Sequence, residues 1–130
     1  TLERVKALVQ AGQPHQAIQG LRQLRPTHRK SANLHYWFGR AYFDKHFYSD
    51  GIAAYREAIR LNPRFRRHRA LIEDLVALVG HRKVHYKAAY LLRHEIGRPA
   101  LPSLRNVARR HPKDKVRVLA ARLIVQISAR

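Results

Sequence analysis

Residues 32–65, ANLHYWFGRAYFDKHFYSDGIAAYREAIRLNPRF, repeat a pattern that is already present in residues 1–31. At one constant offset, Leu8, Ala17, Leu21 and Leu24 align with Tyr42, Gly51, Tyr55 and Ala58. A helix pair of this length buries its apolar face only by stacking on a neighbouring pair. The period therefore predicts an array of helical hairpins, an architecture that usually binds other molecules.

Apolar residues recur at helical spacing along the rest of the chain, and no segment shows the alternation of a half-buried strand. We therefore expect an all-α fold of about eight helices. Glycine, proline and capping residues set the expected ends of the helices. The first five are expected at residues 2–11, from 14 to before 26, 32–45, from 49 or 50 to 61, and 65–79, and the last three include residues 84–97, 99–104 and 116–127.

Small and aromatic residues lie where the two helices of the second hairpin must approach closely: Gly39, Tyr42, Gly51, Tyr55 and Ala58, with Pro63 at the exit. In this pattern residues 32–65 resemble a tetratricopeptide (TPR) repeat, although the tryptophan position of that family holds His35. Residues 1–31 resemble a degenerate copy. The resemblance implies TPR-like hairpins over residues 1–65.

Residues 116–127, preceded by Asp114, share a second pattern with residues 84–97. Both segments resemble the first helix of a HEAT-like repeat of the phycobilisome-lyase type, and residues 99–104 between them resemble its second helix. The earlier copy has one extra residue before Ile96, so we expect an irregular last turn there. Residues 66–130 are thus expected to hold a junction helix followed by HEAT-like repeats. The two resemblances together imply one continuous right-handed α-solenoid.

The chain is strongly basic, with 27 Lys and Arg against 8 Asp and Glu and a formal net charge of +19. Residues 1–65 carry 11 basic and 4 acidic residues (+7), and residues 66–130 carry 16 and 4 (+12). An excess of this size favours an anionic partner, and the alternative is an arginine-rich composition on ordinary solvated helix faces. The absence of cysteine excludes disulfides, thiolate nucleophiles and cysteine zinc sites.

The TPR resemblance implies a binding groove, because in that family the first helix of each pair lines the concave face. The groove positions carried onto this chain are Lys6, Asn33, Tyr36, Arg40 and Phe43. The cations and the amide would hold the carboxylates of an acidic protein segment, and the two aromatic rings would take an apolar side chain. We therefore expect a non-enzymatic scaffold for protein–protein interaction.

Two basic clusters indicate a rival function, the binding of nucleic acid or another polyanion. The first cluster, at the expected start of the fifth helix, is Arg64, Arg66, Arg67 and Arg69, and the second, at the start of the eighth, is Lys113, Lys115 and Arg117. Cations at a helix N-terminus oppose its macrodipole and so favour a bound anion such as a phosphate.

An enzyme of the HEAT-like class, a lyase or a glycosylase, is the third and most distant alternative. Glu73 and Asp74 are adjacent, so on a helix they point about 100° apart, and no nucleophile motif accompanies them. His81 and His85 have the spacing of two metal ligands on one helix face, but the sequence offers no third ligand beside them. We expect no catalytic residue, metal or cofactor.

The last expected helix carries two apolar faces. One is Val116, Leu119, Ala120, Leu123, Ile124 and Ile127, and the other is Val118, Ala121 and Val125. A finished helical array normally ends on a helix with a polar outer face. We therefore expect further repeats or another chain to cover this helix, and the chain to be a piece of a longer protein. No apolar run is long enough to span a membrane.

Overall fold

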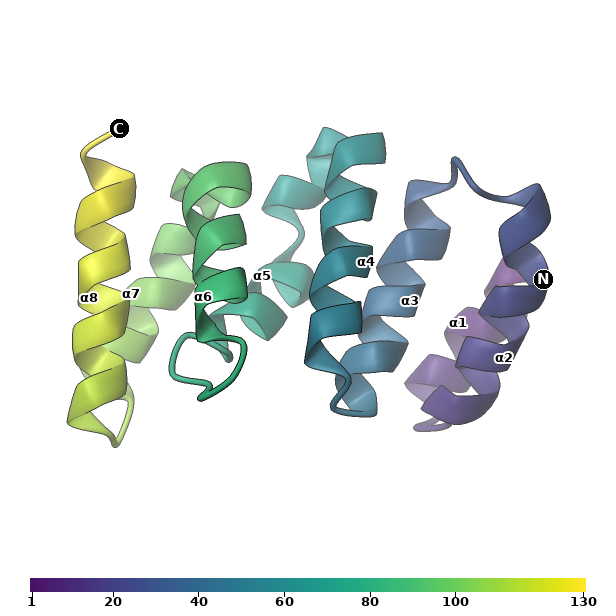
Figure 1. Cartoon of the computed structure of the whole chain (residues 1–130), viewed down its shortest axis with the longest axis horizontal. Helices are drawn as coiled ribbons and strands as arrows, with labels where there is room; N and C mark the ends of the chain where they lie inside the picture. The colour runs from purple at the N-terminus through teal and green to yellow at the C-terminus, as the bar shows by residue number, and fades with distance from the viewer. The chain divides into compact units, whose positions relative to one another are not determined.

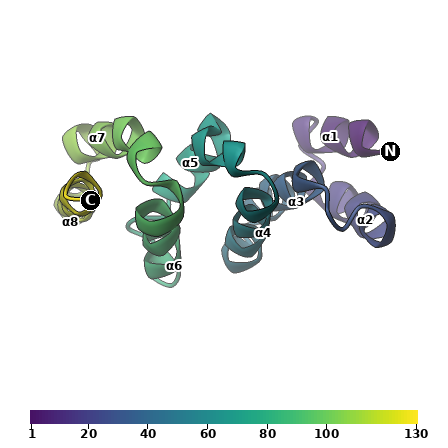
Figure 2. The ribbon, with the colours of Figure 1, turned by 90° about the horizontal axis from the view of Figure 1, so that it is seen from above.

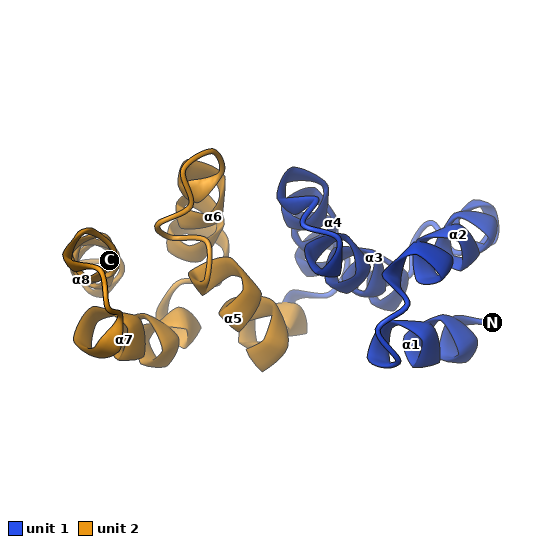
Figure 3. Ribbon diagram, turned by 90° about the horizontal axis from the view of Figure 1, so that it is seen from below, with its two compact units in different colours: residues 1–63 blue, residues 64–130 orange.

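The computed structural model describes all 130 residues and contains helices and no strands, which confirms the predicted all-α class. Eight α-helices are present, joined by short 3₁₀ segments and one π-helical turn (Figure 1). The chain divides into two compact units, unit 1 at Thr1–Pro63 and unit 2 at Arg64–Arg130 (Figure 3).

Unit 1 consists of two helical hairpins. Its elements are α1 (Leu2–Gln10), α2 (Pro14–Leu24), the 3₁₀ segment η1 (Arg25–Thr27), α3 (Ala32–Asp44) and α4 (Tyr48–Leu61). Two of the helices begin at capping hydroxyls, because the Thr1 side chain accepts from the amide of Arg4 and Ser31 Oγ accepts from the amide of Leu34 at 3.1 Å. Proline opens α2, where its missing N–H has no helical partner to lose.

The core of unit 1 combines aliphatic residues of α1 and α2 with residues of α3. Val5, Ile18, Leu21, Leu34 and Phe38 are among its buried members. The second hairpin is held by close approach at two glycines. A Cβ on Gly39 would overlap the ring of Tyr55, and one on Gly51 would overlap the ring of Phe43. The small residues that the sequence places at these positions therefore let α3 and α4 pack tightly.

Unit 2 begins with irregular helical structure and ends with a regular hairpin. Its elements are η2 (Pro63–Arg67), whose first residue still belongs to unit 1, α5 (Arg69–Val76), α6 (His85–Tyr90), the π-helical turn η3 (Leu91–Ile96), η4 (Arg98–Ala100), α7 (Leu101–Arg110) and α8 (Asp114–Ser128). Figure 2 shows α7 and α8 next to each other at the C-terminal end of the chain.

The expected helix over residues 65–79 is wrong in extent. His68 has an extended backbone (φ −75°, ψ 115°) and separates η2 from α5, and α5 ends at Val76. Leu78 and Val79 are buried in the following turn instead of on the helix. The break keeps most of the local arginines out of the first turn of α5, where they would oppose the helix dipole.

The irregular turn expected before Ile96 is confirmed. The amide of Gly97 donates to the carbonyl of Leu92, five residues back, at 2.8 Å, which is the hydrogen bond of a π-helix. Such a turn accommodates one residue more than an α-helical turn does. Gly97 then takes a φ of 71° and a ψ of −136°, which redirects the chain into η4.

The last helix, α8, buries only one of its two apolar faces. Val116, Ala120, Leu123 and Ile127 are buried, and Leu119 and Ile124 are half-buried. The second face lies in the open, with Val118 57% and Val125 67% exposed. None of the eight helices combines the length and the apolar character that a membrane crossing requires.

Candidate functional site

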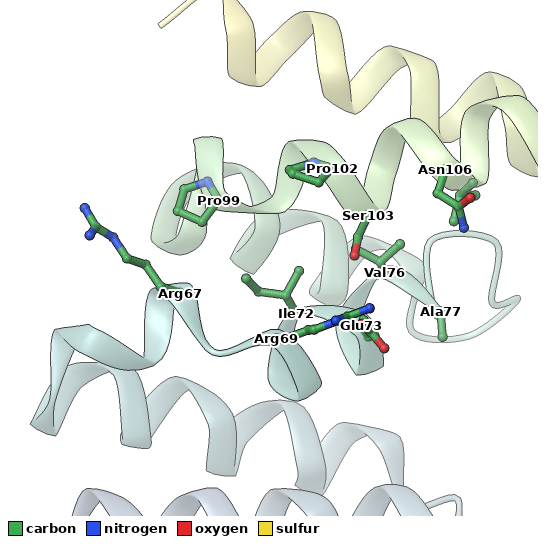
Figure 4. Close-up of a pocket in the computed structure, with 11 residues that line it drawn as sticks. Arg67, Arg69, Ile72, Glu73, Val76, Ala77, Pro99, Pro102, Ser103 and Asn106 are labelled. Atoms are coloured by element: carbon green, nitrogen blue, oxygen red, sulfur yellow. Dashed lines mark hydrogen bonds and ion pairs between the residues drawn. The ribbon is translucent and has the colours of Figure 1, made fainter.

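A groove of unit 2 lies between α5 and α7 and has a volume of about 740 Å³ (Figure 4). We call it the α5–α7 groove. Its apolar floor comes from Ile72 and Val76 on α5 and from Pro99, Pro102 and Val107 on η4 and α7. Its polar rim is formed by Arg67, Arg69, Glu73, Ser103 and Asn106.

The floor follows from the spacing of the apolar residues on α5. Ile72 and Val76 lie four residues apart, so both occupy one face of the helix. They are 5% and 3% exposed and point from α5 toward the α7 side of the groove (Figure 4). Pro102, on the opposite wall, is exposed and donates no backbone hydrogen bond. The apolar surface that a ligand can reach therefore comes mainly from Pro102, with the half-buried Pro99 and Val107 beside it.

The rim carries one cation that no carboxylate of the groove neutralises. Arg69 Nε donates to Glu73 Oε1 at 2.7 Å, one helical turn along α5. Arg67 lines the groove from η2, apart from this pair, and its side chain extends away from Ile72 in Figure 4. Ser103 and Asn106 supply neutral hydrogen-bonding groups on the α7 side. The rim thus favours a ligand with a carboxylate near Arg67 and polar groups toward α7.

The groove residues do not form a catalytic arrangement. Its single carboxylate, Glu73, is already paired with Arg69, and no histidine lines the groove. His81, one of the two histidines with metal-ligand spacing, instead accepts from the amides of Lys83 and Val84 through Nδ1 at 3.1 and 3.4 Å.

In unit 1 the structure separates the expected groove residues into surface and packing roles. Lys6 Nζ lies 5.9 Å from the ring centroid of Trp37, a cation–π contact between α1 and α3. Asn33 is exposed and Arg40 is half-buried on the same helix as Trp37. These residues form one basic, aromatic surface, which we call the Trp37 surface.

Tyr36 and Phe43, expected to receive a ligand side chain, pack α3 against α4. Tyr36 is 5% exposed, and its ring stacks on Tyr55 with centroids 5.9 Å apart. Phe43 is half-buried and also stacks on Tyr55, with centroids 5.1 Å apart. Trp37, which is half-buried and packs against the core of unit 1, is the ring of α3 that Lys6 contacts. The sequence carried this signal, because Trp37 lies four residues after Asn33 and three before Arg40.

The expected basic clusters do not both surround helix N-termini. Arg64, Arg66 and Arg67 lie on η2, and Arg69 alone falls in the first turn of α5. At the start of α8, Arg117 pairs with Asp114 and donates to the carbonyl of His111. Lys113 and Lys115 are exposed. The structure brings Arg67 and Arg69 to the α5–α7 groove and Arg66 to a different pocket of unit 2.

Comparison of the chain with known protein families, with curated protein sequences and with solved structures finds no match.

Proposed function

We propose that this chain is a segment of a right-handed α-solenoid, with TPR-like hairpins over residues 1–65 and HEAT-like hairpins after them. The repetition of residues 1–31 in residues 32–65 and the close approach at Gly39 and Gly51 support the first part. The hairpin of α7 and α8, and the π-helical turn at the position of the extra residue, support the second. The exposed face of α8 suits a neighbouring repeat or another chain.

We propose that the function of this segment is to bind an acidic segment of another protein. The observation that carries the proposal is the α5–α7 groove, which places an apolar floor beside a cation that no groove carboxylate neutralises. An apolar side chain of the partner would pack against the exposed Pro102 and the half-buried Pro99 and Val107. A neighbouring carboxylate would meet Arg67, whose planar fork matches a carboxylate. This division between burial and orientation is usual in peptide grooves.

The Trp37 surface of unit 1 supplies a second contact of the same chemistry. Lys6 and Arg40 provide positive charge, and the half-buried indole of Trp37 offers an aromatic face beside them on α1 and α3. An acidic partner with apolar side chains would find both features there.

Binding of a nucleic acid is the second candidate, and the charge of unit 2 favours it. Arg64–Arg130 contain 17 basic and 4 acidic residues, a formal charge of +13, whereas Thr1–Pro63 contain 10 and 4, or +6. A chain with this excess is attracted to a phosphate backbone without reading its sequence.

A binding titration at increasing salt separates the two candidates. The probes are a fluorescent peptide that alternates Glu pairs with Leu and a duplex DNA of similar length. Our proposal predicts that the peptide binds with a modest salt dependence and loses affinity when its Leu residues become Ser at unchanged charge. DNA binding that is tighter than peptide binding, with a slope of about −0.9 per phosphate contact in log–log form, would favour the second candidate.

A further inference from the structure

A second, smaller pocket in unit 2 lies where two helical segments end. We call it the arginine pocket. It has a volume of about 300 Å³ and lies beside Gly97, at the end of η3, and Ile127, in the last turn of α8. Its charged and titratable lining residues are Arg66, Arg93, His94, Glu95, Arg98 and Arg130.

Four separate elements each deliver one arginine to this pocket. Arg66 comes from η2, Arg93 from η3, Arg98 from η4, and Arg130 follows the end of α8. Glu95 is the only carboxylate among the lining side chains, so the formal charge with neutral His94 is four minus one, or +3. None of the four guanidinium groups forms an ion pair within the chain.

Carbonyl groups at the helix ends account for the placement of two of the arginines. Arg130 Nη1 donates to the carbonyl of Arg93 at 2.9 Å and lies 3.2 Å from His94 Nδ1. Arg98 Nη2 donates to the carbonyl of Ser128 at 3.5 Å. Cations are favourable at helix C-termini, where carbonyl groups lack helical partners. These contacts fix the two side chains and leave most of their five N–H donors each for another acceptor.

No carbonyl contact of this kind explains the placement of the other two arginines, Arg66 and Arg93. The Arg66 side chain makes no hydrogen bond within the chain, and the Nε of Arg93 is buried without an acceptor. A buried donor without a partner is unfavourable, and so is the gathering of four like charges around one small pocket. An anion in the pocket would offset the repulsion between these like charges.

We propose that the arginine pocket binds a phosphate group. Guanidinium groups from four elements suit a compact, doubly charged anion with several acceptor oxygens better than a single planar carboxylate. The size of the pocket agrees with this, because it has less than half the volume of the α5–α7 groove. The group could be free phosphate or the phosphate of a phosphorylated side chain, since both present the same chemistry. The site is separate from the α5–α7 groove and does not depend on the function proposed for it.

The test is an NMR titration of the isotopically labelled chain with inorganic phosphate at constant ionic strength. The signals to follow are the amide of Gly97 and the Nε–Hε group of Arg93. We expect saturable shifts at both. Arg66→Gln should weaken phosphate binding by about tenfold, or about 1.4 kcal/mol. This variant removes no hydrogen bond within the protein, so its thermal unfolding should be unchanged.

Arg122→Gln is the matched control, because Arg122 is an exposed arginine of α8 outside the pocket and loses the same charge. It should change the dissociation constant by less than about twofold, which is the effect of net charge alone. Equal weakening by Arg66→Gln and Arg122→Gln, or shifts no larger than those that chloride produces, would overturn the proposal.

Titration with a phosphoserine peptide and with the same peptide without the phosphate then identifies where the bound phosphate group comes from. Tighter binding of the phosphopeptide than of phosphate assigns the site to a phosphorylated partner, and equal binding assigns it to free phosphate.

Discussion

Gly39 on α3 lies so close to the ring of Tyr55 on α4 that its Cα has no room for a side chain. The ring cannot easily move aside, because it stacks on Tyr36 at 5.9 Å and on Phe43 at 5.1 Å. This contact joins the two helices of the hairpin that repeats the pattern of residues 1–31. It explains in physical terms why a small residue stands at this position of the pattern.

Gly39→Ala is therefore expected to destabilise the protein, although alanine is the better helix former. Overpacking of a filled contact costs about 1–3 kcal/mol, and the gain in helix propensity offsets up to about 1 kcal/mol of it. Chemical denaturation followed by circular dichroism measures the change. Ala53→Gly, at an exposed position of α4, measures the propensity term alone. A variant Gly39→Ala that is more stable than the parent would contradict the packing at this contact.

Gly97→Ala tests the backbone turn that follows the π-helical segment. An added Cβ would meet no atom within 4 Å, so the expected loss comes only from the φ of 71° and ψ of −136°, a region that other residues avoid. The free energy of unfolding should fall by about 1–3 kcal/mol.

His46 allows the opposite substitution, from a side chain to glycine, because it is the one residue other than glycine with a positive φ, at 61°. His46→Gly should stabilise the protein by about 0.5–1 kcal/mol, and a less stable variant would show that the stacking of His46 on Tyr48 outweighs the backbone strain.

Helix ends with a local chemical signal could be predicted from the sequence, and ends without one could not. Pro14 and Ser31 mark the starts of α2 and α3 as expected, and the extra residue before Ile96 predicts an irregular turn, which the structure shows to be π-helical. The break at His68 carries no proline, glycine or capping side chain. The apolar spacing alone therefore predicts one continuous helix, whereas the break separates Arg64, Arg66 and Arg67 on η2 from Arg69 on α5.

The residues of the candidate sites could likewise be predicted from the sequence only where a local pattern marks them. Arg67 was identified from its place in a basic cluster, but its neighbours in the α5–α7 groove, Ser103 and Asn106, were not. They reach the groove because α7 packs on α5, and no local pattern encodes that contact. The sequence predicts Arg66 of the arginine pocket as an anion ligand but not its partners Arg93, Arg98 and Arg130, since the four arginines are spread over residues 66–130.

The ion pair of Glu57 and Arg60 on α4 predicts a defined dependence of stability on pH. Arg60 Nε donates to both carboxylate oxygens of Glu57, at 3.1 and 3.0 Å, and this hydrogen bonding holds the pKa of Glu57 below its usual value of 4.5. A group whose pKa is lower in the folded state stabilises that state above its unfolded pKa. This stabilisation is lost as the pH falls through the folded pKa.

Glu57→Gln should therefore be slightly less stable than the parent at neutral pH and equally stable at a pH below the folded pKa of Glu57. Urea denaturation at several pH values and low salt measures the difference, because salt screens an exposed pair. A difference between the two proteins that stays constant from neutral to acidic pH would mean that the ion pair is not its cause.

The two faces of α8 should respond differently to substitution. Leu123 is buried, so Leu123→Ala should reduce the free energy of unfolding by about 2–5 kcal/mol. Val125 is 67% exposed, and Val125→Ser should change it by less than about 0.5 kcal/mol. Denaturation of both variants, with sedimentation velocity to detect self-association, makes the comparison. Comparable losses would show that another surface of the protein covers the second face.

The affinity of the α5–α7 groove for an acidic peptide, measured with a charge reversal at its rim, tests the proposed function most directly. The Glu- and Leu-containing peptide is titrated against the parent chain, Arg67→Glu and Arg122→Glu, an equal change of charge on an exposed site of α8. We predict that Arg67→Glu weakens binding by about tenfold or more, or about 1.4 kcal/mol, and that Arg122→Glu weakens it by less than about twofold. Equal weakening by the two variants would mean that the peptide responds only to net charge, and it would contradict a groove that binds a protein segment.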